Sequence, residues 1–99
     1  MIKTLNDLDI EFADRFERQL IDAPDEIKEA FLDTLELFLD DSRNPFLRNH
    51  PLKEKFVGYR SIDVTDNWRV VFKETDTGDR IVITFRLIGT HKERFCRKP

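Results

Sequence analysis

The sequence has 99 residues, of which 39% are hydrophobic and 37% are charged, and its formal net charge at pH 7 is −3. This length suits one domain with a single modest core. No stretch is long and apolar enough for a membrane-spanning helix, and the N-terminus lacks the basic region and apolar run of an export signal. The single cysteine, Cys96, excludes an internal disulfide. We therefore expect one domain over residues 1–99, located in the cytoplasm and not bound to a membrane.

The charge is divided unevenly along the chain. Residues 1–42 hold four basic and thirteen acidic side chains, a balance of −9, whereas residues 43–99 hold thirteen basic and seven acidic ones, a balance of +6. Attraction to phosphate at short range depends on the local charge and not on the total. The basic second half therefore keeps nucleic acid open as a partner in spite of the negative net charge.

Residues 9–41 have the pattern of two amphipathic helices, and residues 1–5 are expected as a short first strand. From Asp9 onward, apolar residues recur at three- and four-residue steps. Pro24 ends the first helix and suits the first turn of the second, where its missing N–H is not needed. The second helix is expected to end before Ser42. Both apolar faces should pack into the core.

Residues 43–99 predict a loop and then an antiparallel meander. Strands and turns are recognised by side-chain alternation and by turn-forming Asp, Asn, Thr and Gly. The loop is expected over residues 43–56, the strands at 58–64, 68–73 and 80–88, and the turns at 65–67 and 75–79. In the last strand, regular alternation places Ile81, Ile83, Phe85 and Leu87 on one face and Val82, Thr84, Arg86 and Ile88 on the other.

Two helices followed by such a meander predict an α+β fold, with both helices packed on one face of a small antiparallel sheet. Because side chains alternate across a strand, Asp63, Arg69 and Arg86 are expected on the opposite face. Two arginines on a face that no helix covers favour an anion-binding site. The sequence has no cluster with the spacing of metal ligands, and it indicates no cofactor.

Four motifs in the second half resemble one known superfamily. They are Asn49-His50-Pro51-Leu52-Lys53, Gly58-Tyr59-Arg60-Ser61, Trp68-Arg69-Val70-Val71-Phe72, and Ile88-Gly89-Thr90-His91 ending in Phe95. Their order and spacing resemble the RelE/ParE superfamily, and most closely the RelE/YafQ toxins of bacterial type II toxin–antitoxin systems. The resemblance extends over about residues 8–96. It implies a RelE-like fold and an mRNA interferase, an endoribonuclease that cleaves messenger RNA, usually on the ribosome, and that a cognate antitoxin protein neutralises.

The sequence departs from this pattern at two positions. Where YafQ-like members place a further histidine in the second strand, this chain has Asp63. The basic residue of the last strand, Arg86, stands one place before the expected position, which is occupied by Leu87. The acidic overall balance is also unusual among such toxins.

The resemblance implies a metal-independent cleavage in which the 2′-hydroxyl of the RNA is the nucleophile. Such a reaction needs a base, an acid and cations. His50 and His91 can serve as base or acid because imidazole changes charge near neutral pH. Arg69 can hold the scissile phosphate, Phe95 can stack on an unstacked base, and Asp63 can act as a base or orient its neighbours. The basic residues expected to contact RNA are Lys53, Lys55, Arg60, Arg86, Lys92 and Arg94.

Each role has a structural alternative that the sequence leaves open. Either histidine could be a loop residue bonded to the backbone, Arg69 could pair with Asp63 across two strands, and Phe95 could pack a C-terminal tail. Two other functions also stay open, namely a ParE-like toxin that inhibits DNA gyrase and a degenerate member that only binds its antitoxin. Two histidines together with Arg69 favour the nuclease, because a binding module needs no acid–base group.

Overall fold

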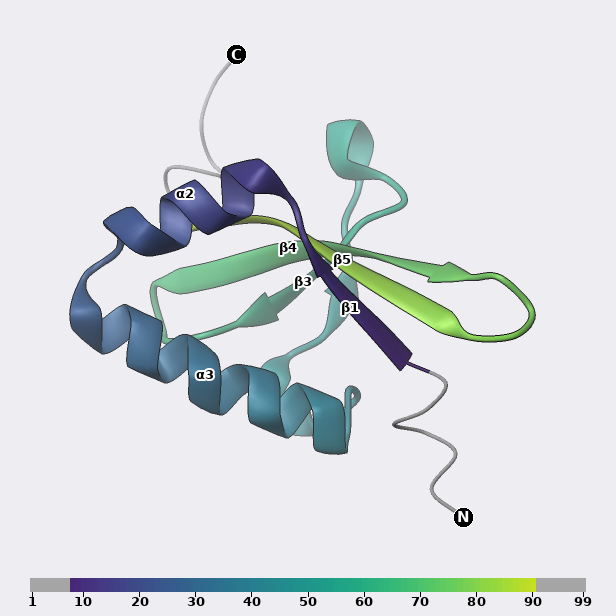
Figure 1. Ribbon diagram of the computed structural model, residues 1–99, viewed down its shortest axis with the longest axis horizontal. Helices are drawn as coiled ribbons and strands as arrows, with labels where there is room; N and C mark the ends of the chain where they lie inside the picture. Colours follow the sequence, from purple (N-terminus) through teal and green to yellow (C-terminus); the bar gives the residue numbers. More distant parts are fainter. Residues whose placement is uncertain (1–7, 91–99) are drawn as a thin grey trace.

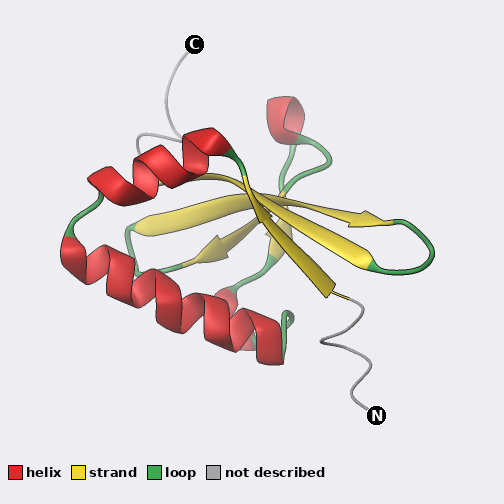
Figure 2. Ribbon diagram, in the orientation of Figure 1, coloured by secondary structure: helices red, strands yellow, loops and turns green. Residues whose placement is uncertain are grey.

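The computed structural model describes residues 8–90 of the chain. Its helices and strands are β1 (Leu8–Phe12), α2 (Asp14–Asp22), α3 (Asp25–Asp40), β2 (His50–Pro51), β3 (Arg60–Asp63), β4 (Trp68–Asp76) and β5 (Ile81–Thr90), with short 3₁₀ helices at Pro45–Leu47 and Glu54–Phe56. The five strands form one sheet in the order β1-β5-β4-β3-β2. In Figure 1 the turn between β4 and β5 projects beyond the ends of both helices, and Figure 2 shows the two helices in red and the strands of the sheet in yellow. No helix within these residues is long and apolar enough to cross a membrane.

The two helices confirm the α+β prediction and the predicted break between them. Ala23 and Pro24 have extended backbone angles, and α3 begins at Asp25 with a second acidic residue behind it in the first turn. Negative charge is favourable there because the N-terminal end of a helix carries partial positive charge. The second helix ends at Asp40, before Ser42, as predicted.

Residues 8–12 form a strand, so the prediction of a helix from Asp9 is wrong for the first four residues. β1 runs parallel to β5, with Phe12 opposite Phe85, and the sheet is therefore mixed and not purely antiparallel. The predicted strand at residues 1–5 lies outside the described residues. The short β2 at the far edge of the sheet lies within the stretch that was predicted to be a loop.

The spacing of the first phenylalanines explains why the sequence is misleading here. Phe12 and Phe16 stand four residues apart, as on one helix face, and their rings do stack at 5.6 Å between centroids. The first belongs to a strand and the second to a helix, and Phe12 also stacks on Phe85 at 5.6 Å. Leu8 and Ile10 complete the alternation of a strand and pack against the core.

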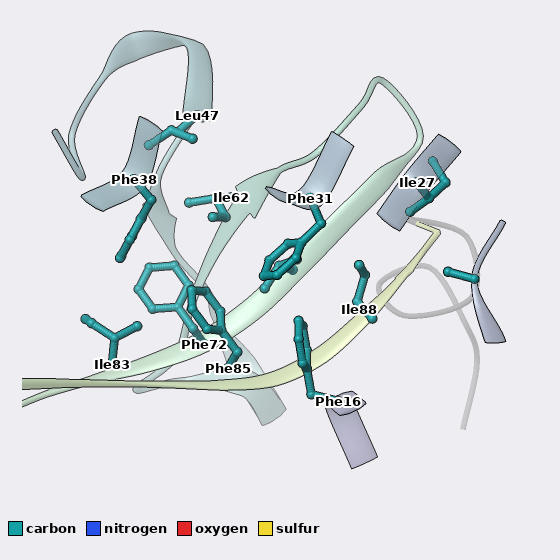
Figure 3. Packing of buried hydrophobic residues seen from close by; sticks show 12 residues of the cluster. Phe16, Ile27, Phe31, Phe38, Leu47, Ile62, Phe72, Ile83, Phe85 and Ile88 are labelled. Carbon is teal, nitrogen blue, oxygen red and sulfur yellow. The ribbon is translucent and has the colours of Figure 1, made fainter. Parts of the chain in front are cut away.

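The core fills the space between the helices and one face of the sheet (Figure 3). Its buried members are Phe16, Ala23, Ile27, Phe31, Phe38, Leu47, Ile62, Val70, Phe72, Ile83, Phe85 and Ile88. Phe85 is central, since its ring centroid lies between 5.6 and 5.9 Å from those of Phe12, Phe16, Phe31, Phe38 and Phe72. Such aromatic pairs contribute about 0.5–1.5 kcal/mol beyond the area that they bury.

A β-bulge interrupts the pairing of β4 with β5. Val71 pairs with Leu87 but the next residue, Phe72, pairs with Phe85, so that Arg86 is an extra residue on β5. One extra residue reverses the alternation beyond it. The predicted alternation is therefore right up to Arg86 and wrong for Leu87 and Ile88.

The bulge exchanges the predicted orientations of Leu87 and Ile88. Ile88 is 1% exposed and belongs to the core, where Leu87 was expected. Leu87 lies with Val71 on the face turned away from the helices, and Arg86 remains on that side, over the ring of Tyr59. Arg86 stands one residue before the position at which the superfamily pattern places a basic residue. The bulge lies at this same point of the strand.

Candidate functional site

The sheet face turned away from the helices carries most of the residues predicted to be functional. Residues directly opposite each other on antiparallel strands share a face. One row across the sheet, from β2 to β5, consists of His50, Ser61, Val71 and Leu87. The next row consists of Asp63, Arg69 and Gly89. The structure therefore brings His50, Asp63 and Arg69 to neighbouring positions on one surface.

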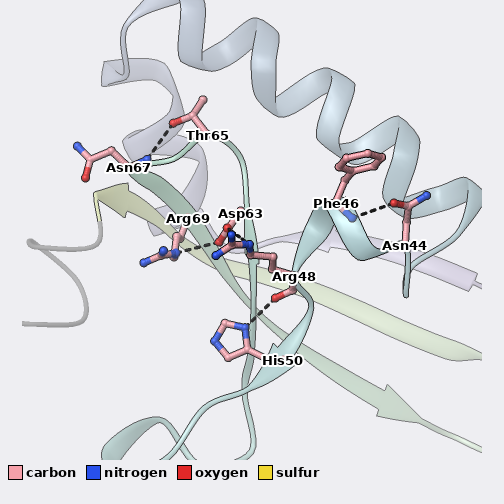
Figure 4. A network of polar contacts seen from close by, with 8 residues as sticks. All are labelled: Asn44, Phe46, Arg48, His50, Asp63, Thr65, Asn67 and Arg69. Atoms are coloured by element: carbon pink, nitrogen blue, oxygen red, sulfur yellow. Dashed lines mark hydrogen bonds and ion pairs between the residues drawn. The ribbon is translucent and has the colours of Figure 1, made fainter.

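Asp63 joins two arginines (Figure 4). Arg69 Nε donates a hydrogen bond of 2.8 Å to Asp63 Oδ1, and Arg48 Nε lies 3.7 Å from Asp63 Oδ2. The side chains of Asp63 and Arg69 are 15% and 20% exposed, whereas that of Arg48 is 74% exposed. The cross-strand ion pair that the sequence left open is thus present, and it fixes the orientation of the Arg69 guanidinium group.

Arg48 is presented by a tight turn that the fold holds in place. Asn44 Oδ1 accepts a hydrogen bond of 3.0 Å from the backbone N–H of Phe46, and Leu47 is buried in the core. Arg48 itself has φ 53° and ψ 44°, in the left-handed region. A non-glycine residue there costs about 1–3 kcal/mol and persists only where surrounding contacts determine it. The turn therefore sets the direction of the Arg48 side chain.

His50 is bonded to the backbone of the same turn. Its Nδ1 lies 2.7 Å from the carbonyl oxygen of Arg48. A carbonyl can only accept, so Nδ1 carries a proton and donates it, and Nε2 is the ring nitrogen left to take up a proton. In Figure 4 the exposed ring lies beside the Arg48 backbone, next to the pair of Asp63 and Arg69. The hydrogen bond to the backbone, which was the structural alternative for His50, is therefore present. It also selects the tautomer with the proton on Nδ1, which leaves Nε2 free to act as a general base.

A depression of about 520 Å³ lies over this network. Its lining residues are Pro45, Phe46, Arg48, Asp63, Val64, Thr65, Asp66 and Arg69. Two arginines and two carboxylates make its formal charge neutral. Phe46 is 86% exposed at its rim, and the sequence analysis did not single it out.

A second depression, of about 300 Å³, lies further along the same face. Its lining residues are Ala13, Arg15, Lys55, Phe56, Tyr59, Val71, Arg86 and Leu87. It holds three cations and no carboxylate, and none of these cations forms a salt bridge with a described acidic residue. The guanidinium carbon of Arg86 lies 5.7 Å from the Tyr59 ring centroid, and Lys73 Nζ lies 5.9 Å from it. Such contacts hold a cation in place without neutralising it.

Two predicted RNA-binding residues lie elsewhere. Arg60 pairs with Phe72 and so points to the helix side of the sheet, where its Nε donates a hydrogen bond of 2.7 Å to Asn49 Oδ1. Burial lowers the pKa of Arg60, and the positive charge of Arg43 lowers it further. Lys53 is exposed beside the second 3₁₀ helix and lines neither depression.

Of the other predicted residues, Lys55 and Arg86 lie together in the second depression. The predicted site residues His91 and Phe95, together with Lys92 and Arg94, lie outside the described residues. Sequence reasoning missed Arg15 and Arg48. The first belongs to a helix at the other end of the chain, and only the fold brings it to this face. Arg48 stands two residues before His50, and this closeness in the sequence could have indicated that it belongs to the site.

Solved structures of bacterial toxins have the same fold. E. coli YafQ is 23% identical, with a TM-score of 0.72 over 88% of this chain and 97% of that chain. The E. coli DinJ–YafQ complex matches with 27% identity and a TM-score of 0.64, over 89% of this chain and 98% of that chain. The Mycobacterium tuberculosis RelBE2 toxin–antitoxin complex matches with 20% identity and a TM-score of 0.58, over 83% and 95%.

The sequence also matches a protein family over most of its length. Comparison with the curated proteins finds no significant match. The family described as the ParE toxin of type II toxin–antitoxin systems, parDE, matches residues 10–95. This match and the YafQ-like fold confirm the resemblance seen in the sequence. The chain belongs to the ParE toxin family, within the RelE/ParE superfamily, and is the toxin component of a type II toxin–antitoxin system.

Proposed function

We propose that this toxin is a metal-independent endoribonuclease that cleaves messenger RNA, with the ribosome as its place of action. The observation that carries the proposal is the hydrogen bond from His50 Nδ1 to the Arg48 carbonyl. It leaves Nε2 as the proton acceptor, on a surface that also presents Arg48 and Arg69. An acid–base group beside two cations is what cleavage of a phosphodiester requires.

The reaction proceeds by attack of the 2′-oxygen on the adjacent phosphorus. His50 Nε2 takes the proton of the 2′-hydroxyl, the new P–O2′ bond forms, and the P–O5′ bond breaks. His91 gives a proton to the departing 5′-oxygen. Arg48 and Arg69 stabilise the charge that grows on the phosphoryl oxygens, and Asp63 positions Arg69. The products are a 2′,3′-cyclic phosphate, or the 3′-phosphate that its hydrolysis yields, and a 5′-hydroxyl.

The second depression binds phosphates that flank the cleaved bond. Its three cations, Arg15, Lys55 and Arg86, have no carboxylate beside them in the lining. Each neutralised phosphate releases counterions, so the affinity for RNA should fall steeply with added salt. Lys92 and Arg94 are proposed to extend this contact, and Phe95 to stack on a base.

The cut sites and the chemistry of the ends test the proposal. Primer extension on cellular messenger RNA after induction maps the cuts, and labelling of the fragments identifies their ends. Arg69→Ala should reduce cleavage by roughly 100- to 1,000-fold, because it removes a preorganised donor. Arg18→Ala, which removes an exposed cation from α2, is the matched control and should cleave normally. A 5′-phosphate end would contradict attack by the 2′-hydroxyl.

A second candidate function is inhibition of DNA gyrase without RNA cleavage. The family match, which is to ParE toxins, favours it. A third is a degenerate toxin that only binds its antitoxin, because Asp63 stands where a histidine is expected and pairs with Arg69. A supercoiling assay with purified gyrase separates the second candidate from the first. Full toxicity of an Arg69→Ala, His91→Ala double variant would move the gyrase function to first place.

A further inference from the structure

We propose that Phe46 is a base-stacking platform, on which a nucleotide beside the cleaved bond places its base while Arg48 and Arg69 hold adjoining phosphate. This inference rests on the proposed ribonuclease function, because it assigns a substrate subsite to the same depression. It requires the bound RNA to be single-stranded at this point, since only an unpaired base can lie flat on a protein ring.

The exposure of Phe46 is the first observation. At 86% exposed, it is more open to solvent than any other aromatic side chain that the structure describes. The ring does not stand alone on the surface, because it lines the same depression as Arg48 and Arg69. An exposed aromatic ring beside cations is the usual arrangement by which proteins grip single strands.

The rigidity of the turn is the second observation. Phe46 lies in the 3₁₀ helix Pro45–Leu47, between a proline and a side chain that is 1% exposed and anchors the turn in the core. Its backbone N–H donates to Asn44 Oδ1 at 3.0 Å. Figure 4 shows the Phe46 ring and this bond at the start of the segment that leads to His50. Because the backbone of the turn is already fixed, little backbone freedom is lost when a base stacks on the ring, and the contact contributes efficiently to binding.

The charges around the ring favour a nucleotide over an apolar protein segment. Arg48 and Arg69 share one carboxylate, Asp63, and the side chain of Arg48 remains 74% exposed and open to an anion. An apolar segment over Phe46 would cover these charged groups and remove water from them, which is costly. A nucleotide supplies a flat ring for Phe46 and an anion for the arginines.

The second depression does not offer an equivalent platform. It has two aromatic rings: Tyr59 already receives Arg86 and Lys73 at 5.7 and 5.9 Å from its centroid, and Phe56 is only partly exposed. We therefore assign the base contact to Phe46 in the first depression and the flanking phosphate contacts to the cations around Arg86 in the second.

The test is a binding cycle with the full chain and uncleavable RNA. The probe is a short 2′-O-methyl RNA, together with a series in which one nucleotide at a time is abasic, and affinity is measured by fluorescence anisotropy. Phe46→Leu should weaken binding of the parent RNA roughly 10- to 100-fold, and Phe46→Tyr should bind within about threefold of the wild type. One abasic RNA should bind the wild type more weakly than the parent RNA by a similar factor. The same abasic RNA should bind Phe46→Leu with the same affinity as the parent RNA does. Val57→Ala, which trims another exposed apolar residue, is the control and should leave all affinities unchanged.

Several results would overturn the proposal. They are unchanged affinity in Phe46→Leu, equal losses for every abasic RNA, and no binding of any RNA by the wild type. Loss of antitoxin binding with intact RNA binding in Phe46→Leu would likewise overturn it and assign the ring to a protein contact. If the binding cycle holds but the wild type cleaves no RNA, the ribonuclease proposal fails while Phe46 remains a stacking site for bound RNA.

Discussion

Arg69 and Asp63 face each other across β4 and β3, and Arg69 Nε donates a 2.8 Å hydrogen bond to Asp63 Oδ1. The carboxylate thus stands where a histidine is expected in YafQ-like toxins, and the arginine on the next strand is its direct partner. The two residues act as a unit. This ion pair orients the guanidinium group of Arg69.

Asp63→Asn should therefore lower activity through Arg69. The amide keeps the size of the side chain but removes the charge that orients both arginines. We expect RNA cleavage to fall at least tenfold, and the free energy of unfolding to fall by about 1–2 kcal/mol, since a charge-assisted bond at a partly exposed site is lost. Urea unfolding and single-turnover cleavage measure the two effects. Asp66→Asn, in the same depression, is the control; an equal effect there would show that only the total charge matters.

Two substitutions of His50 distinguish a role in positioning from a role in proton transfer. His50→Asn can still donate to the Arg48 carbonyl from a position close to that of Nδ1, whereas His50→Gln places its amide nearer to Nε2. Neither amide transfers a proton at neutral pH. Both variants should lose roughly 100- to 10,000-fold in the rate of cleavage, with unchanged thermal unfolding, because the side chain is exposed. Full activity in His50→Asn would mean that the ring only shapes the turn.

The bulge can be removed by deletion. Without Arg86, the order Phe85, Leu87, Ile88 alternates regularly and matches the faces that these residues already occupy. We expect the deletion variant to fold with a loss of less than about 2 kcal/mol, mostly from the lost contact with Tyr59. Its affinity for RNA should fall. The salt dependence of RNA binding should decrease by the amount that corresponds to about one phosphate contact.

Deletion of Thr84 is the matched control. This residue lies in the regularly paired part of β5, so its loss turns the side chains on one side of the gap to the wrong face. The variant should be severely destabilised. Guanidinium unfolding followed by circular dichroism compares the two deletions, and equal stability would be inconsistent with a bulge at Arg86.

Phe85 should be the most costly phenylalanine to truncate. Its ring touches five others, and Phe85→Ala should lower the free energy of unfolding by about 3–5 kcal/mol. Phe12 also stacks on two rings but is 38% exposed, so Phe12→Ala should cost clearly less. Denaturant titrations of both variants provide the comparison. A reversed order would show that β1 contributes more to the core than its burial suggests.

Antitoxin binding should depend on salt. The partner is expected to bring acidic or apolar side chains to the basic sheet half, whose residues 43–99 have a balance of +6. Charge complementarity of this kind speeds association and is screened by ions. Calorimetric titration of the isolated pair at low and high salt measures the effect. Equal affinity at both concentrations would show that electrostatics do not guide the complex.

The sequence predicts the regular elements because their patterns are local. The helix break at Pro24, the buried face of β4 and the placement of Asp63 and Arg69 all follow from spacing alone. The sequence predicts a helix at β1 because Phe12 and Phe16 fit a helical spacing, and only the pairing with β5 reveals a strand. That pairing joins residues about 70 positions apart, and no local pattern encodes it.

The missing parts of the site have similar causes. Alternation in β5 continues without a visible break from Ile81 to Ile88, so nothing in it marks Arg86 as the extra residue. Phe46 and Leu47 are adjacent apolar residues in a loop without periodicity, yet one is exposed and the other is buried. Their difference comes from the hydrogen bond of Asn44 and the packing of the turn on the core, which only the folded chain shows.

The parallel pairing of β1 with β5 has a consequence for biosynthesis. The first strand of the sheet finds its neighbour only in the last, and Asp9 forms an ion pair with Arg80, 71 residues later. A nascent chain that ends after β4 contains the strand that carries Arg69 but lacks Phe85, around which the core packs. Long-range pairing of this kind delays folding until the distant partner is available. We therefore expect a chain that ends after β4 to lack the folded sheet that presents Asp63 and Arg69 together.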